Sequence, residues 1–131
     1  MHRRLLLSAL ISSGLAACTS SKRSENVQRV VVFFTADSAA LDENAQQAIR
    51  QAAAMAQANP LVLVRVLGFA APDTGTPAFN RVLAQARAQN VADGLIAAGV
   101  ARERVRIQSR GAVAFEQMPT ESRRVEIAID T

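Results

Sequence analysis

The strongest constraint on the fold is the alternation of strand-like and helix-like stretches between residues 29 and 129. Runs rich in β-branched and apolar residues predict strands, and stretches with apolar residues at helical spacing predict helices. The predicted strands cover 29–34, 61–69, 105–110 and 123–129, and the predicted helices cover 42–59 and 76–98. Helices between strands favour right-handed crossovers, and a loop alone between the last two strands favours an antiparallel arrangement. We therefore expect an α+β fold of order β-α-β-α-β-β, a two-layer sandwich whose mixed four-stranded sheet carries both helices on one face.

Local signals support these boundaries. The first run, 29–34, is apolar almost throughout and predicts a buried strand. Asp42 is a candidate N-cap of the first helix, and Thr76 is the candidate for the second helix, with Pro77 at its first position and Gly99 after its end. Small residues recur on one side of the first helix and predict a face that can lie close to a sheet. They are Ala45, Ile49, Ala52, Ala53 and Ala56.

The first residues have the pattern of an exported protein. Residues 1–4 are basic at their end, 5–17 form a short apolar run, and Cys18 follows directly. Residues 15–18, Leu-Ala-Ala-Cys, are similar to the lipobox of bacterial lipoproteins, in which a peptidase cuts before a cysteine that carries lipid. The alternative is a cysteine that only closes the apolar run. We therefore expect a signal peptide at 1–17, a tether at 18–28 that starts at a lipidated Cys18, and a folded domain at 29–131. Thr19 after the cysteine implies delivery to the outer membrane.

Composition argues against nucleic-acid binding and offers no catalytic pattern. The formal net charge is +4, and it falls to about +2 when the predicted signal peptide is removed. The chain has no Trp or Tyr and only 5 Phe, so aromatic side chains for base stacking are scarce. The single histidine, His2, lies in the predicted signal peptide, and neither a nucleophile-elbow serine nor metal-ligand spacing occurs. We therefore expect a protein that is not an enzyme, has no metal or other cofactor, and binds no nucleic acid.

One arginine is predicted on the buried side of the second helix. At about 100° per residue, Arg87 and Asn80 both fall inside the apolar sector of that helix. A buried arginine is costly unless its charge meets an anion and its donors are satisfied. The anion could be a domain carboxylate such as Asp37 or Asp73, or the side chain could reach solvent along the sheet. Alternatively, the planar guanidinium could hold a ligand carboxylate with paired hydrogen bonds. Spacing alone leaves these alternatives open.

Four segments carry a family resemblance. They are VFFTADSAAL (32–41), GTPAFN (75–80), LAQARAQNVADGLIAAGV (83–100) and RRVEIAI (123–129). In this order and spacing they resemble the OmpA-like domain family, which includes C-terminal domains of outer membrane protein A and MotB, and the peptidoglycan-associated lipoproteins. The lipoprotein-like start fits the last branch. The resemblance implies an outer-membrane lipoprotein whose periplasmic domain binds the diaminopimelate of peptidoglycan non-covalently and tethers the envelope to the cell wall.

The resemblance also implies binding residues. In the family, a helix arginine and a loop aspartate hold the carboxylate and the amine of diaminopimelate, and Arg87 falls on that arginine. Asn80 and Asp37 fall on polar positions near the family's site. Backbone amides of the loop that starts at Thr74 would complete the contacts. The implied partners are peptidoglycan, a membrane through the lipid on Cys18, and other envelope proteins as further candidates.

The family's loop aspartate does not carry over directly. The chain matches the family at Gly68, Phe69 and Ala70, but the aspartate position holds Ala71. Asp73 follows in a loop with one extra residue. It either takes the place of the family's acid or caps backbone amides of the turn. If the acid is lost, the alternative function is an envelope scaffold that binds partner proteins and has a degenerate, non-binding peptidoglycan site.

Overall fold

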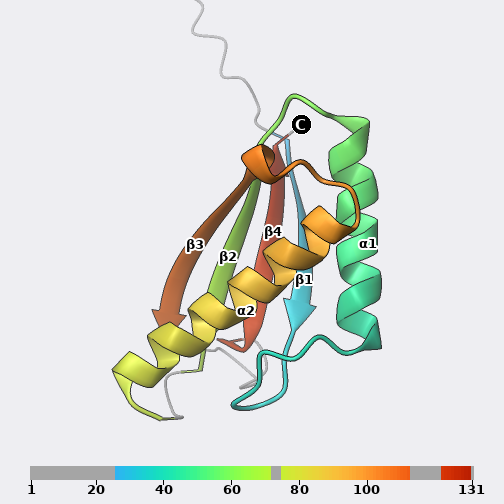
Figure 1. The fold of residues 1–131 in the computed structure, drawn as a ribbon. Helices are drawn as coiled ribbons and strands as arrows, with labels where there is room; N and C mark the ends of the chain where they lie inside the picture. Colours follow the sequence, from blue (N-terminus) through green and yellow to red (C-terminus); the bar gives the residue numbers. More distant parts are fainter. Residues whose placement is uncertain (1–25, 72–74, 113–121, 131) are drawn as a thin grey trace, which may run out of the picture.

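The computed structural model describes residues 26–71, 75–112 and 122–130. They form β1 (Val27–Phe33), α1 (Glu43–Ala58), β2 (Val64–Ala70), α2 (Pro77–Ala97), the short 3₁₀ helix η1 (Arg102–Arg104), β3 (Val105–Ala112) and β4 (Arg124–Asp130). Apart from η1 this is the predicted order of strands and helices (Figure 1). The predicted signal peptide at 1–17, Cys18 with tether residues 19–25, and the loop residues Asp73 and Thr74 lie outside the described residues.

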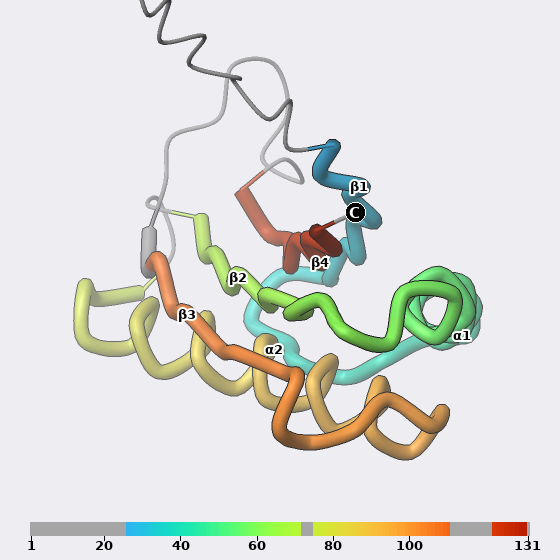
Figure 2. The backbone as a smooth tube through the Cα atoms, turned by 90° about the horizontal axis from the view of Figure 1, so that it is seen from above, coloured from blue at the N-terminus to red at the C-terminus, as the bar shows by residue number. Residues whose placement is uncertain are grey.

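The four strands form one mixed sheet in the order β1-β4-β2-β3. β2 pairs in parallel with β3, and β4 pairs antiparallel with both β1 and β2, so β1, β2 and β3 run in one direction. We call the end where these three strands begin the amino end of the sheet, and the end where they finish the carboxyl end. Both helices lie on one face of the sheet (Figure 2). The predicted two-layer α+β architecture is therefore confirmed.

The last two strands run antiparallel as predicted, but β2 lies between them. Burial explains the placement of β4. Its helix-side residues Val125, Ile127 and Ile129 have no exposed surface, and Ala128 on the other face is 1% exposed. A strand whose helix-side residues are all buried suits a central position, where β1 and β2 pair with it along both edges. β3 instead alternates apolar residues with exposed polar ones, which suits an outer position.

Two strands differ from the sequence prediction. β1 begins at Val27, two residues early, and it is an outer strand rather than a buried one, with Val31 and Phe33 exposed. Only alternate residues of an outer strand can face the helices, so an apolar run does not ensure burial. β2 begins at Val64 rather than at residue 61, and Leu61 is 98% exposed in the turn before it.

The predicted helix caps and core face are confirmed. The Asp42 carboxylate accepts a hydrogen bond from the backbone N–H of Ala45 at 2.7 Å, and the Thr76 hydroxyl accepts one from that of Phe79 at 3.1 Å. Gly99 follows α2 with a φ of +107°, a conformation that suits glycine at a helix end. The small-residue face of α1 is buried against the sheet at all five predicted positions.

Gly68 is where β2 and α2 come closest together. A Cβ added there would lie 2.2 Å from the backbone oxygen of Ala84. Carbon and oxygen cannot approach so closely, since contacts are optimal at about 3.5–4.0 Å. The missing side chain therefore lets α2 cross the sheet at short range. This crossing sets the height at which Arg87, one turn further along α2, meets the carboxyl end of the sheet.

Gly68→Ala is expected to lower the free energy of unfolding by about 1–3 kcal/mol, because α2 must shift away from β2. Denaturant unfolding followed by circular dichroism measures the change. The matched control is Gly94→Ala in the same helix, where the new methyl group would meet side chains and no backbone of another element: Ile49 at 3.2 and 3.3 Å and Leu41 at 3.9 Å. That variant is expected to be neutral or slightly stabilising, since alanine favours helices by about 1 kcal/mol over glycine. Equal destabilisation by both would contradict a special approach at Gly68.

Candidate functional site

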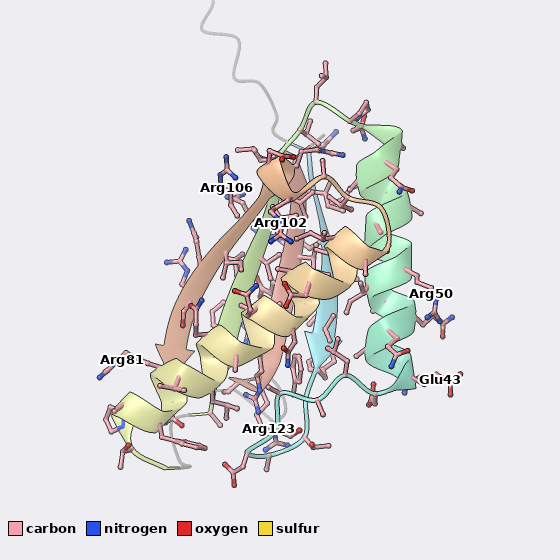
Figure 3. All side chains as sticks on the ribbon, viewed as in Figure 1. Glu43, Arg50, Arg81, Arg102, Arg106 and Arg123 are labelled. Carbon is pink, nitrogen blue, oxygen red and sulfur yellow. The ribbon has the colours of Figure 1, made fainter. Side chains whose placement is uncertain are left out.

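The candidate site lies at the carboxyl end of the sheet. The loop 34–42 leaves β1 there, residue 71 follows β2, and α2 begins there at Pro77. Loops at the carboxyl ends of parallel strands are common positions for ligand sites in sheets covered by helices. Figure 3 places the labelled side chain of Arg123 at this same end, beside the loop after β1.

Arg87 is the central residue of the site. It has no exposed surface, as its position on the apolar sector of α2 predicts. Its Nε donates a hydrogen bond to the carbonyl of Ser38 at 2.8 Å. Its Nη1 donates to the carbonyl of Phe69 at 3.2 Å, and its Nη2 to that of Thr35 at 3.0 Å. The guanidinium also lies 5.2 Å from the centre of the Phe34 ring. Arg87 therefore fastens the loop after β1 to the end of β2.

The charge of Arg87 is not matched by a carboxylate among the described residues. The ion pairs within that part of the chain join Arg29 and Arg124 to Glu126 and Arg65 to Asp130. Burial, reinforced by the positive charge of Arg123 and opposed by the negative charge of Asp37, lowers the pKa of Arg87 from its ordinary value to about 10. The guanidinium remains protonated at neutral pH. Among the described residues it is held by carbonyl dipoles rather than by an opposite charge.

These contacts show which partners the buried charge of Arg87 has among the described residues. Arg87 forms no ion pair with Asp37 and does not reach solvent. A guanidinium has five N–H donors, of which three are used by the carbonyls. One N–H on each Nη atom has no acceptor within the part of the chain that the structure describes. These two donors are the ones that a carboxylate could accept as a pair.

Asn80 and Asp37 lie at the same end of the molecule. Asn80 is 2% exposed, its backbone N–H donates to Thr76 at 2.9 Å, and its Oδ1 is buried with no hydrogen-bond partner in the described ranges. A buried acceptor without a donor is costly and needs an explanation such as a water or a ligand. Asp37 is exposed and has a φ of +50°, an uncommon conformation for a residue other than glycine. Asp73 and Thr74 belong to the undescribed loop, so their distance from Arg87 is not defined.

Sequence reasoning missed two residues that shape this site. The side-chain amide of Asn90, three residues after Arg87 on α2, donates to the carbonyl of Ala39 at 2.7 Å. The spacing of three residues along one helix face was the signal that could have found it. Arg123 donates from Nε to the carbonyl of Phe34 at 3.3 Å. The position of Arg123 at the start of the closing strand gives no signal of this contact.

Comparison with known proteins places this fold in a family. The family model described as OmpA family matches residues 33–126. The chain belongs to the OmpA family. The match begins at the end of β1 and ends within β4, so it includes both helices and every described residue of the candidate site. The resemblance inferred from the four sequence segments is therefore confirmed.

Individual relatives agree with this membership. Outer membrane protein 40 of Porphyromonas gingivalis is 36% identical over 81 residues, which are 62% of this chain and 21% of that protein. The chain thus spans about a fifth of that OmpA-family relative. The peptidoglycan-associated lipoprotein from Burkholderia pseudomallei shares the fold with a TM-score of 0.68 at 23% identity, covering 76% of this chain and 88% of that one. The cell wall anchor of the T6SS from Pseudomonas aeruginosa has a TM-score of 0.66 at 26% identity, covering 80% and 82%.

Within the described residues, no group of three or more His, Cys, Asp or Glu side chains is placed to hold a metal ion. None of the helices in the described ranges is long and apolar enough to cross a membrane.

Proposed function

We propose that this protein binds peptidoglycan non-covalently, through the diaminopimelate of the stem peptide, at the carboxyl end of its sheet. Membership of the OmpA family and the similarity to a structure described as a cell wall anchor support the proposal. The observation that carries it is Arg87, a buried cation with no carboxylate partner among the described residues. A ligand carboxylate would supply the negative charge that the described residues do not.

In the proposed complex, the carboxylate accepts the two remaining donors of Arg87, one on each Nη atom. Asn80 Oδ1 accepts a hydrogen bond from the ligand, and the ligand's ammonium group pairs with an acid, either Asp37 or Asp73. Because Arg87 has no exposed surface, the ligand must displace groups at the carboxyl end to reach it. The three carbonyl bonds keep the guanidinium oriented during this step. No covalent bond changes, so the role is binding rather than catalysis.

The finer proposal concerns the anchor. Residues 1–17 would act as the signal peptide, and Cys18 would carry the lipid in the outer membrane, with the domain in the periplasm. A diacylglycerol and an N-acyl chain hold a protein on a membrane far more firmly than one chain does. The similarity to an outer membrane protein supports an envelope location. A lipid at one end of the chain and a wall ligand on the domain would tether the outer membrane to the cell wall.

A second function is favoured by one observation. Ala71, which takes the position of the family's aspartate, is 1% exposed and follows β2 directly. A buried methyl group there cannot pair with an ammonium ion. If no other acid replaces the aspartate, the protein would act as a lipid-anchored envelope scaffold that binds partner proteins and not peptidoglycan.

Sedimentation with purified peptidoglycan separates the two functions. The Cys18→Ser protein without its signal peptide is expected to co-sediment with walls that contain diaminopimelate and to be released by free meso-diaminopimelate. Walls with lysine at that position are expected to retain much less protein, because lysine lacks the carboxylate that Arg87 would bind. Absence of retention would favour the scaffold, and equal retention on both walls would exclude recognition of the carboxylate.

A further inference from the structure

The amino end of the sheet carries an exposed apolar tip. The turn between α1 and β2 forms this tip, at the end of the molecule opposite the candidate site (Figure 1). Leu61 in this turn is 98% exposed and Leu63 is 44% exposed. The register places the start of β1 at the same end, since Val27 pairs with Asp130 and Val64 pairs with Ile129. The chain therefore enters the domain beside the two leucines.

The turn holds Leu61 outward by a fixed set of hydrogen bonds. The backbone N–H of Val62 donates to the carbonyl of Asn59 at 3.3 Å, which makes a β-turn with Pro60 and Leu61 as its central residues. Arg104 then donates to the carbonyls of Val62, Ala56 and Asn59 at 2.9, 2.8 and 2.6 Å. Exposed central positions of such turns favour polar residues or glycine. The turn therefore does not need a leucine at its tip, yet it presents one in a defined position.

Arginines lie at the same end of the sheet as this tip. Arg102 and Arg106 are exposed at this end of the sheet, as Figure 3 shows, and Arg65 pairs with Asp130 beside them at 2.7 Å. Glu103 is the neighbouring acid. With Arg104 included, this group of residues contains four arginines and two acids. Exposed apolar side chains framed by excess positive charge are the features by which proteins contact anionic lipid surfaces.

We propose that the amino end of the domain, with Leu61 and Leu63 at its tip and Arg102 and Arg106 at the same end, docks on an anionic phospholipid surface. The inference rests on the lipid-anchor part of the proposed function. Eight residues lie between Cys18 and Val27, and the nine steps from one Cα to the next span at most about 30 Å when fully extended. Such a tether holds the amino end at high effective concentration near the membrane, so a weak contact suffices.

The docking would orient the wall-binding site. Strands β1 and β2 each have seven residues, so they separate the amino end from the carboxyl end by about 20 Å. With the amino end on the membrane, Arg87 and its neighbours face away from the lipid. The domain would then present its candidate site toward the wall instead of rotating freely on its tether.

A fluorescent probe at the tip tests the docking. In the lipidated protein the Cys18 sulfur is occupied, so Leu61→Cys supplies the only free thiol for an environment-sensitive dye. Vesicles of roughly three parts phosphatidylethanolamine to one part phosphatidylglycerol represent the anionic surface. The dye at residue 61 is expected to shift its emission to shorter wavelength, and its quenching by a water-soluble quencher is expected to fall several-fold. The control is Val82→Cys near the start of α2, where the exposed side chain is far from the amino end and no change is expected.

The role of the arginines and the presence of lipid on Cys18 are tested by separate measurements. Each arginine near an anionic surface contributes about fivefold to binding, so Arg102→Gln and Arg106→Gln are each expected to lower the equilibrium constant for docking by about that factor. A dye at residue 61 that stays as accessible as one at residue 82 would overturn the proposal, as would a shift caused by peptidoglycan fragments instead of vesicles.

If mass spectrometry shows Cys18 without lipid, the anchor is wrong. The docking is then judged with the Leu61→Cys dye in a Cys18→Ser background added to excess vesicles, where an unshifted emission overturns it.

Discussion

Arg87→Lys is expected to weaken binding to diaminopimelate-containing peptidoglycan by about tenfold or more, because the loss of a hydrogen bond to a charged group costs about 1.5–3 kcal/mol. Lysine keeps the positive charge but loses the planar set of donors. It cannot satisfy the carbonyls of Ser38, Phe69 and Thr35 and also present paired donors to a ligand. The free energy of unfolding is expected to fall by about 1–3 kcal/mol, since a buried carbonyl loses its donor. Sedimentation isotherms and denaturant unfolding measure the two effects.

Arg104→Lys is the matched control for this variant. Arg104 also donates to three backbone carbonyls, those of Val62, Ala56 and Asn59, but it does so at the amino end of the sheet. Its replacement is expected to lower stability by a similar amount and to leave peptidoglycan binding unchanged. If both variants lower wall binding equally, or if neither does, then Arg87 is a structural clamp only. The proposed role of Arg87 in holding the ligand would then be wrong.

The features that follow from local chemistry were predictable from sequence. The caps at Asp42 and Thr76 depend on residues next to the helices that they begin, and the structure confirms both. The burial of Arg87 and Asn80 follows from helical periodicity alone, because a helix turns by a fixed angle per residue. The order of strands and helices followed from the same periodicity. Each of these features is decided within a few residues along the chain.

The features that depend on distant residues were not predictable in this way. β4 lies between β1 and β2, a placement that goes with the full burial of its helix-side residues and not with the loop before it. The acceptors of Arg87 lie 18 to 52 residues away in sequence, and all of them are backbone carbonyls, which no residue type signals. The sequence could identify a buried charge in need of partners. It could not show that carbonyls, and no carboxylate of the described residues, supply them.

The acid that faces the ligand's ammonium group remains a proposal, and an exchange of two residues tests it. If Asp73 takes the place of the family's aspartate, Asp73→Ala is expected to weaken wall binding by about thirtyfold, the lower end of the loss for a desolvated charge pair. Adding Ala71→Asp should then restore most of the affinity. Position 71 is suited to this role because it directly follows β2, two residues after the Phe69 carbonyl that accepts from Arg87.

Ala71→Asp alone distinguishes a replaced acid from a lost one. If Asp73 already supplies the charge, the new aspartate is expected to change binding little, since the ammonium group is already paired. If the acid has been lost, binding should rise by about tenfold or more, because a carboxylate in a desolvated site gains a full charge partner. Ala40→Asp is the control, since it adds the same charge at an exposed position of the loop after β1. Equal gains from both variants would mean that long-range electrostatic attraction strengthens binding, and not a defined ion pair with the ligand. Position 71 would then not be part of the subsite for the ammonium group.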